Sequence, residues 1–592
     1  MAPQGFADKV AFVWRVADKL RGTFKQHEYG SVMLPLLVLR RMDAVLAATK
    51  QAVVREAAKV KDINEGYDML LKSISGQRFY NTSPLTLETM LHDDKHLQEQ
   101  LASYIRHLSP DAYRVMEAYK LDDKLVRMER AGILYGVLSD FADLDLRPDA
   151  VSNEAMGYIF EELLRKFSEM SNETAGEHYT PREVISLMVD LLLTGRANAE
   201  LAENPIPVRT VYDPAAGTGG MLMGAMTQIK HRNPEAKVGV YGQELNDETW
   251  AMAQSDLMMQ DIAPEQMANG NSLTNDKFAG EKFDFILANP PYGVDWKAYA
   301  APIKDEHAKL GFDGRFGAGL PRVSDGSLLF LQHMLSKMKP NGSRVGIVLS
   351  GSPLFSGQAG SGESEIRRWI LENDWLEGIV ALPDQMFYNT GISTYVWVLT
   401  NKKSPDARGL VRLIDGRESG TKMRKSLGDK RKELTDDAIA ELVRLYGDAL
   451  GEDRDEARVK VLTREEFGFQ RITVERPTIG EDGQVALKAG KPVADSSLRD
   501  QENVPLPEGF FDLTETRRTK VLVEAAEKHL AEEIHPYVPD AWIDHKKTKL
   551  GVEIPFTRQF YVYEPPRPVK EIAAEIKELE GQIQEWMAGL GL

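Results

Sequence analysis

The spacing of apolar residues predicts a helical first region. From residue 7 to about 170, apolar positions recur every three or four residues, with few β-branched runs, which indicates amphipathic helices. The clearest helix follows Ser152 and Asn153, either of which can cap it. Its apolar face carries Met156, Ile159, Phe160, Leu163, Leu164, Phe167 and Met170. Such a face needs a packing partner, so we expect an N-terminal helical domain over residues 1–165.

Between about residues 200 and 400 the pattern changes to short β-rich runs that alternate with helices. The runs are Val208–Tyr212, Val238–Tyr241, Phe283–Ala288, Arg344–Leu349, Gly378–Leu382 and Thr394–Leu399. This alternation is typical of a mainly parallel sheet with helices on both faces. We therefore expect an α/β, doubly wound domain over residues 166–410.

The chain beyond residue 410 is more polar. Gln470–Asp500, rich in Gly, Pro and charge, is expected to be a loop or linker. The last segment differs, because its apolar residues recur at alternating spacings of four and three, the a/d seam of a coiled coil. The seam consists of Ile572, Ile576, Leu579, Ile583, Trp586 and Leu590. We assign residues 411–592 to a C-terminal region whose last helix docks on a partner or, alternatively, caps the protein's own core.

Composition narrows the possible chemistry. The 592-residue chain has no cysteine, which excludes disulfides, thiolate metal sites and cysteine nucleophiles. Its formal charge of -17 argues against a protein that binds nucleic acid without the help of a partner. Lys422–Lys432 departs from this balance, since its six basic residues either contact phosphates or form a solvated loop. No apolar run approaches the roughly 18 residues of a membrane span, and the N-terminus lacks a secretory pattern, so we expect no membrane association and a cytoplasmic protein.

The strongest local motif is VYDPAAGTGGML, Val211–Leu222, where a predicted strand ends and a helix begins. Its glycines leave no side chain between the backbone and a bound nucleoside, and the helix start offers unpaired N–H groups. A pyrophosphate loop would need glycine at Leu222, and the acidic Asp213 would repel phosphate. S-adenosylmethionine, which carries a sulfonium and an ammonium group, fits better. The expected donor contacts are Asp213, Ala215, Gly217, Thr218, Gly219 and Gly220.

A second acidic residue ends the next predicted strand. Glu244 lies 24 residues after Gly220 in the sequence YGQELN. A carboxylate at this position typically accepts hydrogen bonds from ribose hydroxyls in doubly wound nucleotide sites. The alternative is a carboxylate that caps a helix near Asn246.

The strand FDFILANPPYG ends in Asn289, Pro290, Pro291 and Tyr292. Two prolines stop the strand and fix its geometry, so the Asn289 side-chain oxygen and the Pro290 carbonyl can accept the two N–H bonds of an aromatic amine. An aromatic amine is a poor nucleophile until its lone pair is freed in this way. Tyr292 can stack on an extruded base. No catalytic metal is required for methyl transfer at such a site.

The segment GEHYTPREV precedes another predicted helix. Thr180, Pro181 and Glu183 fit the N-cap, N1 and N3 positions of a capping box. Capping does not explain His178 and Tyr179, which either cover one side of the donor or pack against the domain's own helices. We therefore count His178, Tyr179 and Thr180 among the candidate donor contacts.

These motifs together resemble the methylation subunit of type I restriction-modification systems, within the amino-group DNA methyltransferases. The resemblance covers most of the chain. It includes the helical stretch Ala17–Leu46 and the motifs HYTPR, DPAAGTGG, GQE, NPPYG, SDGSLLFLQHML, KPNGSRVGIVLS and FYNTGISTYVWVL. The donor motif precedes NPPY, as in that family.

The resemblance implies a seven-stranded methyltransferase sheet and base flipping of adenine in double-stranded DNA, methylated at N6 from S-adenosylmethionine. Phe387 falls near the family's second base-contacting aromatic residue. Asn271 stands where many relatives carry an acidic residue that meets the donor adenine. Two copies of such a chain join one specificity subunit, which would explain the acidic charge and give the C-terminal seam a partner. No nucleotide-binding P-loop motif is present, so translocation and cleavage would belong to a separate restriction subunit.

Three alternatives remain at this point. A cytosine-N4 or ribosomal RNA methyltransferase uses a similar motif, and so does a glutamine-N5 protein methyltransferase, whose usual small size disagrees with this length. A non-catalytic scaffold is disfavoured by intact Asp213, Glu244 and Asn289. The host assembly would be a restriction system or a related phage-defence system.

Overall fold

The computed structural model describes residues 12, 15–60, 63–170, 180–260, 262–263, 266–388, 390–427, 429–481, 483–563 and 568–589. The chain divides into two compact units, Met1–Ile554 and Pro555–Leu592. Along the described part of the chain, no helix has both the length and the apolar character needed to cross a bilayer.

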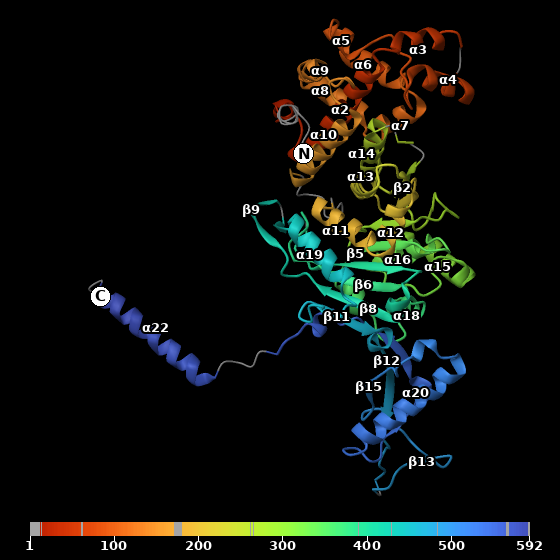
Figure 1. The fold of residues 1–592 in the computed structure, drawn as a ribbon, viewed down its shortest axis with the longest axis vertical. Coiled ribbons are helices and arrows are strands. Elements are labelled where there is room, and N and C mark those ends of the chain that lie inside the picture. The colour runs from red at the N-terminus through yellow and green to blue at the C-terminus, as the bar shows by residue number, and fades with distance from the viewer. Residues whose placement is uncertain are drawn as a thin grey trace. The chain divides into compact units, whose positions relative to one another are not determined.

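The first region is helical, as the sequence predicts (Figure 1). Its helices are α2 (Tyr29–Leu46), α3 (Lys50–Ala57), α4 (Glu65–Ser75), α5 (Leu87–Met90), α6 (Leu97–Arg106), α7 (Pro110–Ala118), α8 (Leu121–Arg130), α9 (Leu134–Asp143) and α10 (Asn153–Met170). Helix α10 is the expected one, and the Ser152 hydroxyl caps it by accepting from the Ala155 N–H at 3.1 Å. Helix α2 is buried along almost its whole length, and α10 packs against it.

A nine-stranded sheet forms the centre of the first unit among the described residues, in the order β11-β8-β6-β7-β5-β4-β1-β2-β3. The strands are β1 (Val208–Asp213), β2 (Lys237–Glu244), β3 (Met267–Asn269), β4 (Phe285–Ala288), β5 (Arg344–Ser350), β6 (Leu376–Ala381), β7 (Thr394–Thr400), β8 (Leu410–Asp415) and β11 (Val459–Thr463). Strand β7 runs antiparallel to β5 and β6, and β11 runs antiparallel to β8.

The expected seven-stranded doubly wound sheet is therefore present in the order β6-β7-β5-β4-β1-β2-β3, and β8 and β11 extend it beyond β6. All six predicted strands form. The short β3 escaped prediction because three residues carry no readable alternation. Strands β8 and β11 lie beyond the proposed boundary at residue 410, and the three-domain division stays a prediction.

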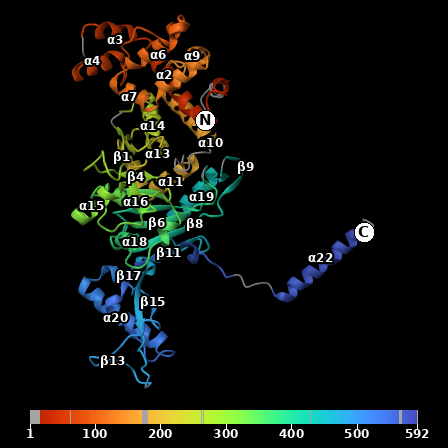
Figure 2. The same ribbon diagram turned by 180° about the vertical axis from the view of Figure 1, so that it is seen from behind.

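Helices cover both faces of the sheet (Figures 1 and 2). On one face, α11 (Arg182–Leu192), α13 (Gly220–Arg232) and α19 (Asp436–Gly447) share one apolar core with Val211. On the other, Tyr212 stacks on Phe283 and bonds His333 of α16 (Ser327–Ser336), which packs against α18 (Gly362–Glu372). Successive strand residues point to opposite faces, so Val211 and Tyr212 mark the two layers.

The remaining helices of this unit are α12 (Arg196–Glu203), α14 (Asp247–Met259), α15 (Ala300–Leu310) and α17 (Ser352–Phe355). Helix α14 packs against α2, α7 and α10 and so joins the sheet to the helical region. Two polar contacts reinforce this junction: the Tyr119 hydroxyl meets Ser255 Oγ at 3.2 Å, and Lys124 Nζ donates to Glu248 at 3.0 Å.

The region after β8 corrects two sequence predictions. Lys422–Lys432, for which a solvated loop was one expectation, lies in a hairpin of β9 (Thr421–Leu427) and β10 (Lys430–Glu433). Gln470–Asp500 begins inside a strand, because β12 (Gly468–Glu475) pairs with β15 (Asp500–Pro505), β16 (Trp542–Ile543) and β17 (Lys549–Val552). The other elements are β13 (Leu487–Lys488), β14 (Lys491–Pro492) and α20 (Glu515–His529).

The second unit holds the short α21 (Phe556–Gln559) and the predicted C-terminal helix, α22 (Val569–Gly589). The seam residues Ile572, Ile576, Leu579, Ile583 and Trp586 are between 41% and 71% exposed. Leu590, the last residue of the predicted seam, lies outside the described residues. Within its own unit, this helix therefore leaves an apolar stripe uncovered.

Candidate functional site

A cavity of about 1520 Å³ opens at the carboxyl ends of β1, β2 and β4. Its floor includes Asp213, Glu244 and Asn289, and its opposite wall comes from the helical region through Ser31, Leu34 and other residues. Single small-molecule sites usually occupy roughly 300–1,000 Å³. The cavity is thus large enough for a nucleoside-sized ligand together with a second group.

The glycine-rich turn after β1 forms one side of the cavity. Gly217 and Gly219 have φ angles of 55° and 83°, the left-handed region that a side chain rarely adopts. A Cβ added at Gly217 would meet no atom within 4 Å, so the backbone there faces open space. Ala215, Thr218 and Gly220 also line the cavity, and Gly219 caps α13. The predicted donor loop is therefore brought together as an open backbone cradle.

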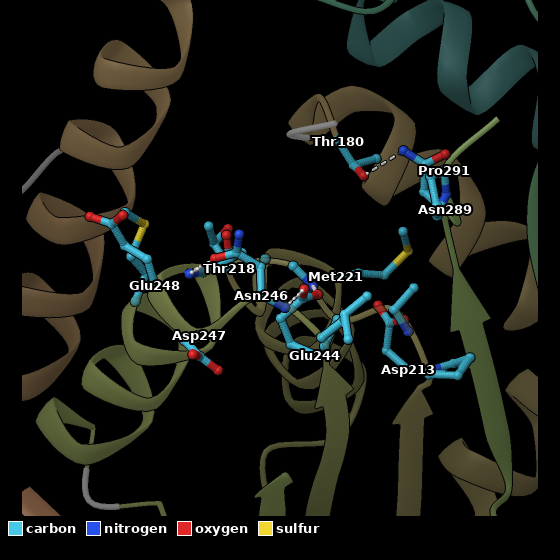
Figure 3. Close-up of a pocket in the computed structure, with 18 of the residues that line it drawn as sticks. Thr180, Asp213, Thr218, Met221, Glu244, Asn246, Asp247, Glu248, Asn289 and Pro291 are labelled. Atoms are coloured by element: carbon cyan, nitrogen blue, oxygen red, sulfur yellow. Dashed lines mark hydrogen bonds between the residues drawn. The ribbon is translucent and has the colours of Figure 1, made fainter. Parts of the chain in front are cut away.

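Glu244, at the end of the neighbouring strand β2, is hydrogen-bonded to this turn. Its carboxylate accepts from the Gly217 N–H at 2.9 Å and from the Asn246 N–H at 2.8 Å. The N-cap of α14 is Asn246, whose side chain accepts from the Thr249 N–H at 2.9 Å. Glu244 therefore does not cap α14 itself, and its carboxylate lines the cavity (Figure 3).

Asp213 is a buried acid at the cavity floor, with 2% of its surface exposed. Burial raises the pKa of Asp213 to about 8, and the nearby negative charge of Glu244 acts in the same direction. The Ala215 N–H, 2.9 Å from the carboxylate, opposes this shift. A cation placed beside Asp213 would favour its ionised form, so the position suits a positively charged ligand.

Asn289 follows β4 directly and is 8% exposed. Its Nδ2 donates to Thr180 Oγ1 at 3.0 Å, and its Oδ1 accepts from the Tyr292 hydroxyl. Figure 3 shows Thr180 and Asn289 facing each other above the strand ends that carry Asp213 and Glu244. The Asn289 amide nitrogen is therefore hydrogen-bonded to Thr180, and the amide oxygen lies on the side of Tyr292. Burial raises the pKa of Tyr292, which keeps its hydroxyl a proton donor.

The capping box predicted at Thr180 is wrong. Helix α11 has Pro181 as its N-cap, without a side-chain capping bond, because the Thr180 side chain bonds Asn289 instead. Glu183 pairs with the buried Lys430 from the β9–β10 hairpin. Both side chains that local spacing assigned to capping are thus used in tertiary contacts. His178 and Tyr179 lie outside the described residues.

Two further predicted residues lie near the site in different ways. Asn271 lines the cavity, and its side-chain oxygen accepts from the Leu273 N–H at 2.9 Å. Phe387 is fully buried and meets Tyr292 edge-on, with ring centroids 6.1 Å apart. It supports Tyr292 from behind in this conformation, while its neighbour Tyr388 lines the cavity.

Several lining residues were not predicted from sequence. Tyr388 stands next to the predicted Phe387, and a second aromatic residue there was the available signal. Ser31, Leu34, Lys120 and Lys124 come from the helical region and carry no local motif. Only the packing of α14 against that region places them at the cavity.

Comparison with known families matches two parts of the chain. Residues 151–469 match the N-6 DNA Methylase family, and residues 10–141 match the HsdM N-terminal domain. The first match covers more than half of the chain and contains Thr180, Asp213, Glu244 and Asn289.

Individual relatives agree with these matches. The type I restriction enzyme MjaIX methylase subunit of Methanocaldococcus jannaschii is 24% identical over 78% of this chain and 79% of its own length. The HindI methylase subunit of Haemophilus influenzae is 31% identical over 49% of this chain and 60% of its own length. Among solved structures, the type I methyltransferase subunit from Streptococcus thermophilus superposes with a TM-score of 0.60, at 24% identity, over 78% of this chain and 97% of that one. This last similarity concerns the fold.

Proposed function

The chain belongs to the N-6 DNA Methylase family and is a DNA adenine-N6 methyltransferase subunit of type I restriction-modification, and from that premise we propose that its cavity holds S-adenosylmethionine beside an adenine flipped out of double-stranded DNA. The observation that carries the proposal is the convergence of Asp213, Glu244 and Asn289 on one cavity.

The donor half of the cavity fits the chemistry of S-adenosylmethionine. Bound there, S-adenosylmethionine supplies a methyl group activated by a positively charged sulfur. Gly217 and its neighbours leave room for a nucleoside against the backbone, and Glu244 is placed to accept from ribose hydroxyls. The acid Asp213 favours a positively charged ligand. Asn271 is assigned to the edge of the donor adenine.

The acceptor half is assigned to Asn289, Pro290, Pro291 and Tyr292. The Asn289 Oδ1 and the Pro290 carbonyl accept the two N–H bonds of the adenine amino group, which localises its lone pair on nitrogen. With S-adenosylmethionine bound, that lone pair would be placed to take the methyl group from sulfur, which would keep the electron pair of the broken bond, and one N–H proton would pass to water. For this, the Tyr292 hydroxyl must leave Asn289 Oδ1, where it donates in the absence of a base. Its ring, supported by Phe387, then stacks on the extruded base.

The partners follow from the family and from the surface of α22. We propose that two copies of this chain join one specificity subunit, which reads the DNA sequence, and that a separate restriction subunit supplies translocation and cleavage. The exposed stripe of α22 is proposed to dock on a helix of the specificity subunit. A division of labour of this kind explains how a chain of charge -17 acts on DNA.

The test combines the full chain, with and without the specificity subunit, with labelled S-adenosylmethionine and DNA, followed by mass spectrometry of the nucleosides. We expect N6-methyladenine from the native chain and none above background from Asn289→Ala, which should still bind the donor. Removal of such a hydrogen-bonding group typically costs about 10²–10³-fold in rate. Appearance of N4-methylcytosine would move the activity to the alternative base, and normal methylation by Asn289→Ala would refute the assigned mechanism.

A further inference from the structure

The β9–β10 hairpin carries the strongest positive patch that the sequence singled out, and the site described above does not use it. We propose that this hairpin is a clamp for the DNA backbone, in which Lys422, Arg424, Lys425 and Arg431 contact phosphates beside the flipped nucleotide. The proposal rests on the proposed function, since it assumes that the cavity receives a base from a duplex.

The hairpin is fixed to the acceptor side of the cavity. Lys430 is buried and pairs with Glu183 of α11, and Lys432 Nζ donates to Asp384 at 2.5 Å. Two backbone bonds add to this anchor: the Asp429 N–H donates to the Tyr388 carbonyl at 2.8 Å, and the Arg431 N–H to the Gln385 carbonyl at 2.9 Å. Two of the six basic side chains thus hold the hairpin in place and are not available to a partner.

This anchor places the hairpin at the cavity itself. Both Asp429, in the turn of the hairpin, and Tyr388, which it bonds, belong to the cavity lining. A flipped base turns about its own backbone, so the phosphates on either side of it stay at the opening through which it enters. Basic side chains on an element that borders the cavity are therefore in reach of those phosphates.

The strand register explains why the other basic side chains point outward. Lys430 pairs with Leu427 and Lys432 pairs with Lys422, so four residues of β9, 423–426, lie opposite the single Arg431. Extra residues on one strand bend it and turn its side chains away from the ladder. In both ribbon views β9 extends outward beyond α19 (Figures 1 and 2). Arg424 and Lys425 lie within this bulge and are exposed.

The charge of the hairpin favours a polyanion as its partner. Residues 421–433 hold six basic and two acidic side chains, a surplus of four positive charges in a chain of net charge -17. Lys422, Arg424, Lys425 and Arg431 are exposed, and none of them forms an ion pair with another residue that the structure describes. Like charges placed this closely repel one another, and phosphates would relieve that repulsion.

The experiment compares duplex binding over a range of salt concentrations for the native chain and for the variant K422Q/R424Q/K425Q/R431Q, each in the assembly with its specificity subunit. Each phosphate contact adds about 0.9 to the slope of log K against log salt. We expect the variant to lose about 2–4 from that slope and at least tenfold in affinity at low salt. The loss should be equal for duplexes with and without the recognition sequence, because phosphate contacts carry no sequence information.

A matched control removes four positive charges elsewhere, in the variant R517Q/K520Q/K528Q/K546Q, whose altered residues are exposed and do not line the cavity. This control should keep the native slope, and both variants should bind S-adenosylmethionine with native affinity. An unchanged slope in the hairpin variant, a loss confined to one DNA sequence, or an equal loss in the control would overturn the clamp. If the native chain itself neither binds nor methylates DNA, it is the proposed function that fails.

Discussion

Replacement of Thr180 by valine tests the orientation of the catalytic amide. The change keeps the shape of the side chain but removes Oγ1, which accepts from Asn289 Nδ2 at 3.0 Å. Without that acceptor, the amide can turn over and present its NH₂ group to the target amine, which needs an acceptor. A turned amide is inactive. The variant should therefore lose turnover although Thr180 touches neither reacting atom.

The size of the effect follows from the single bond that is lost. A neutral hydrogen bond contributes about 0.5–1.5 kcal/mol net. At about 1.36 kcal/mol for each factor of ten in rate, its loss predicts a fall of about two- to tenfold in kcat. This is smaller than the fall of about 10²–10³-fold expected when Asn289 is removed. Donor affinity should stay within twofold, because Gly217, Glu244 and Asp213 are unchanged.

Single-turnover methylation, which excludes product release, measures the chemical step, and calorimetry measures the affinity for S-adenosylmethionine. Thr180→Ser keeps the acceptor and should restore the rate. Thr194→Val is the matched control, because Thr194 lies just beyond the other end of α11. Among the residues that the structure describes, its hydroxyl bonds only the Leu191 carbonyl, at 2.8 Å. Its thermal unfolding and its methylation rate should both match those of the native chain.

Three results would refute this reasoning. A native rate in Thr180→Val would mean that the bond to Asn289 does not orient the amide during catalysis. A large loss of donor affinity with a native rate at saturation would instead place Thr180 in the donor site, as the sequence predicted. A slow Thr180→Ser variant would also count against an acceptor role.

Two other predictions concern the donor and the partner. Burial raises the pKa of Asp213 to about 8, and a cationic ligand favours the ionised form of this acid. The affinity for the donor should therefore rise as the pH increases from 6 to 8. Binding of the donor at pH 7 should release about one proton. Calorimetry in buffers of different ionisation enthalpy measures this release, and Asp213→Asn should abolish it; a flat profile in the native chain would show that no cation sits beside the acid. Deletion of residues 571–592 should prevent co-purification with the specificity subunit but leave donor binding intact, and Ile576→Asp with Ile583→Asp should reproduce the loss, whereas undiminished co-purification would exclude α22 as the docking helix.

Local pattern was sufficient for much of the fold. Apolar runs predicted the six strands that form the middle of the sheet, and spacings of three and four predicted α10 and α22. These features are readable because burial on one face repeats with the period of the element itself. The same logic failed at β3, which is too short to repeat, and at β12, which ends within the segment Gln470–Asp500 that its Gly, Pro and charge content predicted to be a loop.

Candidate residues were found where chemistry is confined to a contiguous motif. The turn that contains Gly217 and the strand ends at Asp213, Glu244 and Asn289 could be identified because parallel strands bring their carboxyl ends to one edge. The roles of Thr180 and Glu183 could not, because their spacing also satisfies a capping box. Their actual partners, Asn289 and Lys430, are 109 and 247 residues away.

The sequence by itself thus determined six strands of the sheet, helices α10 and α22, the family and the motifs that meet at the cavity. Only the tertiary structure decided which atoms those motifs bond: Thr180 on Asn289, Tyr292 on the same amide, and a basic segment folded into an anchored hairpin. The physical reason is that periodicity reports which face of an element is buried, whereas a hydrogen bond needs two groups within about 3 Å in a defined direction. That proximity depends on how distant elements pack, and no local spacing encodes it.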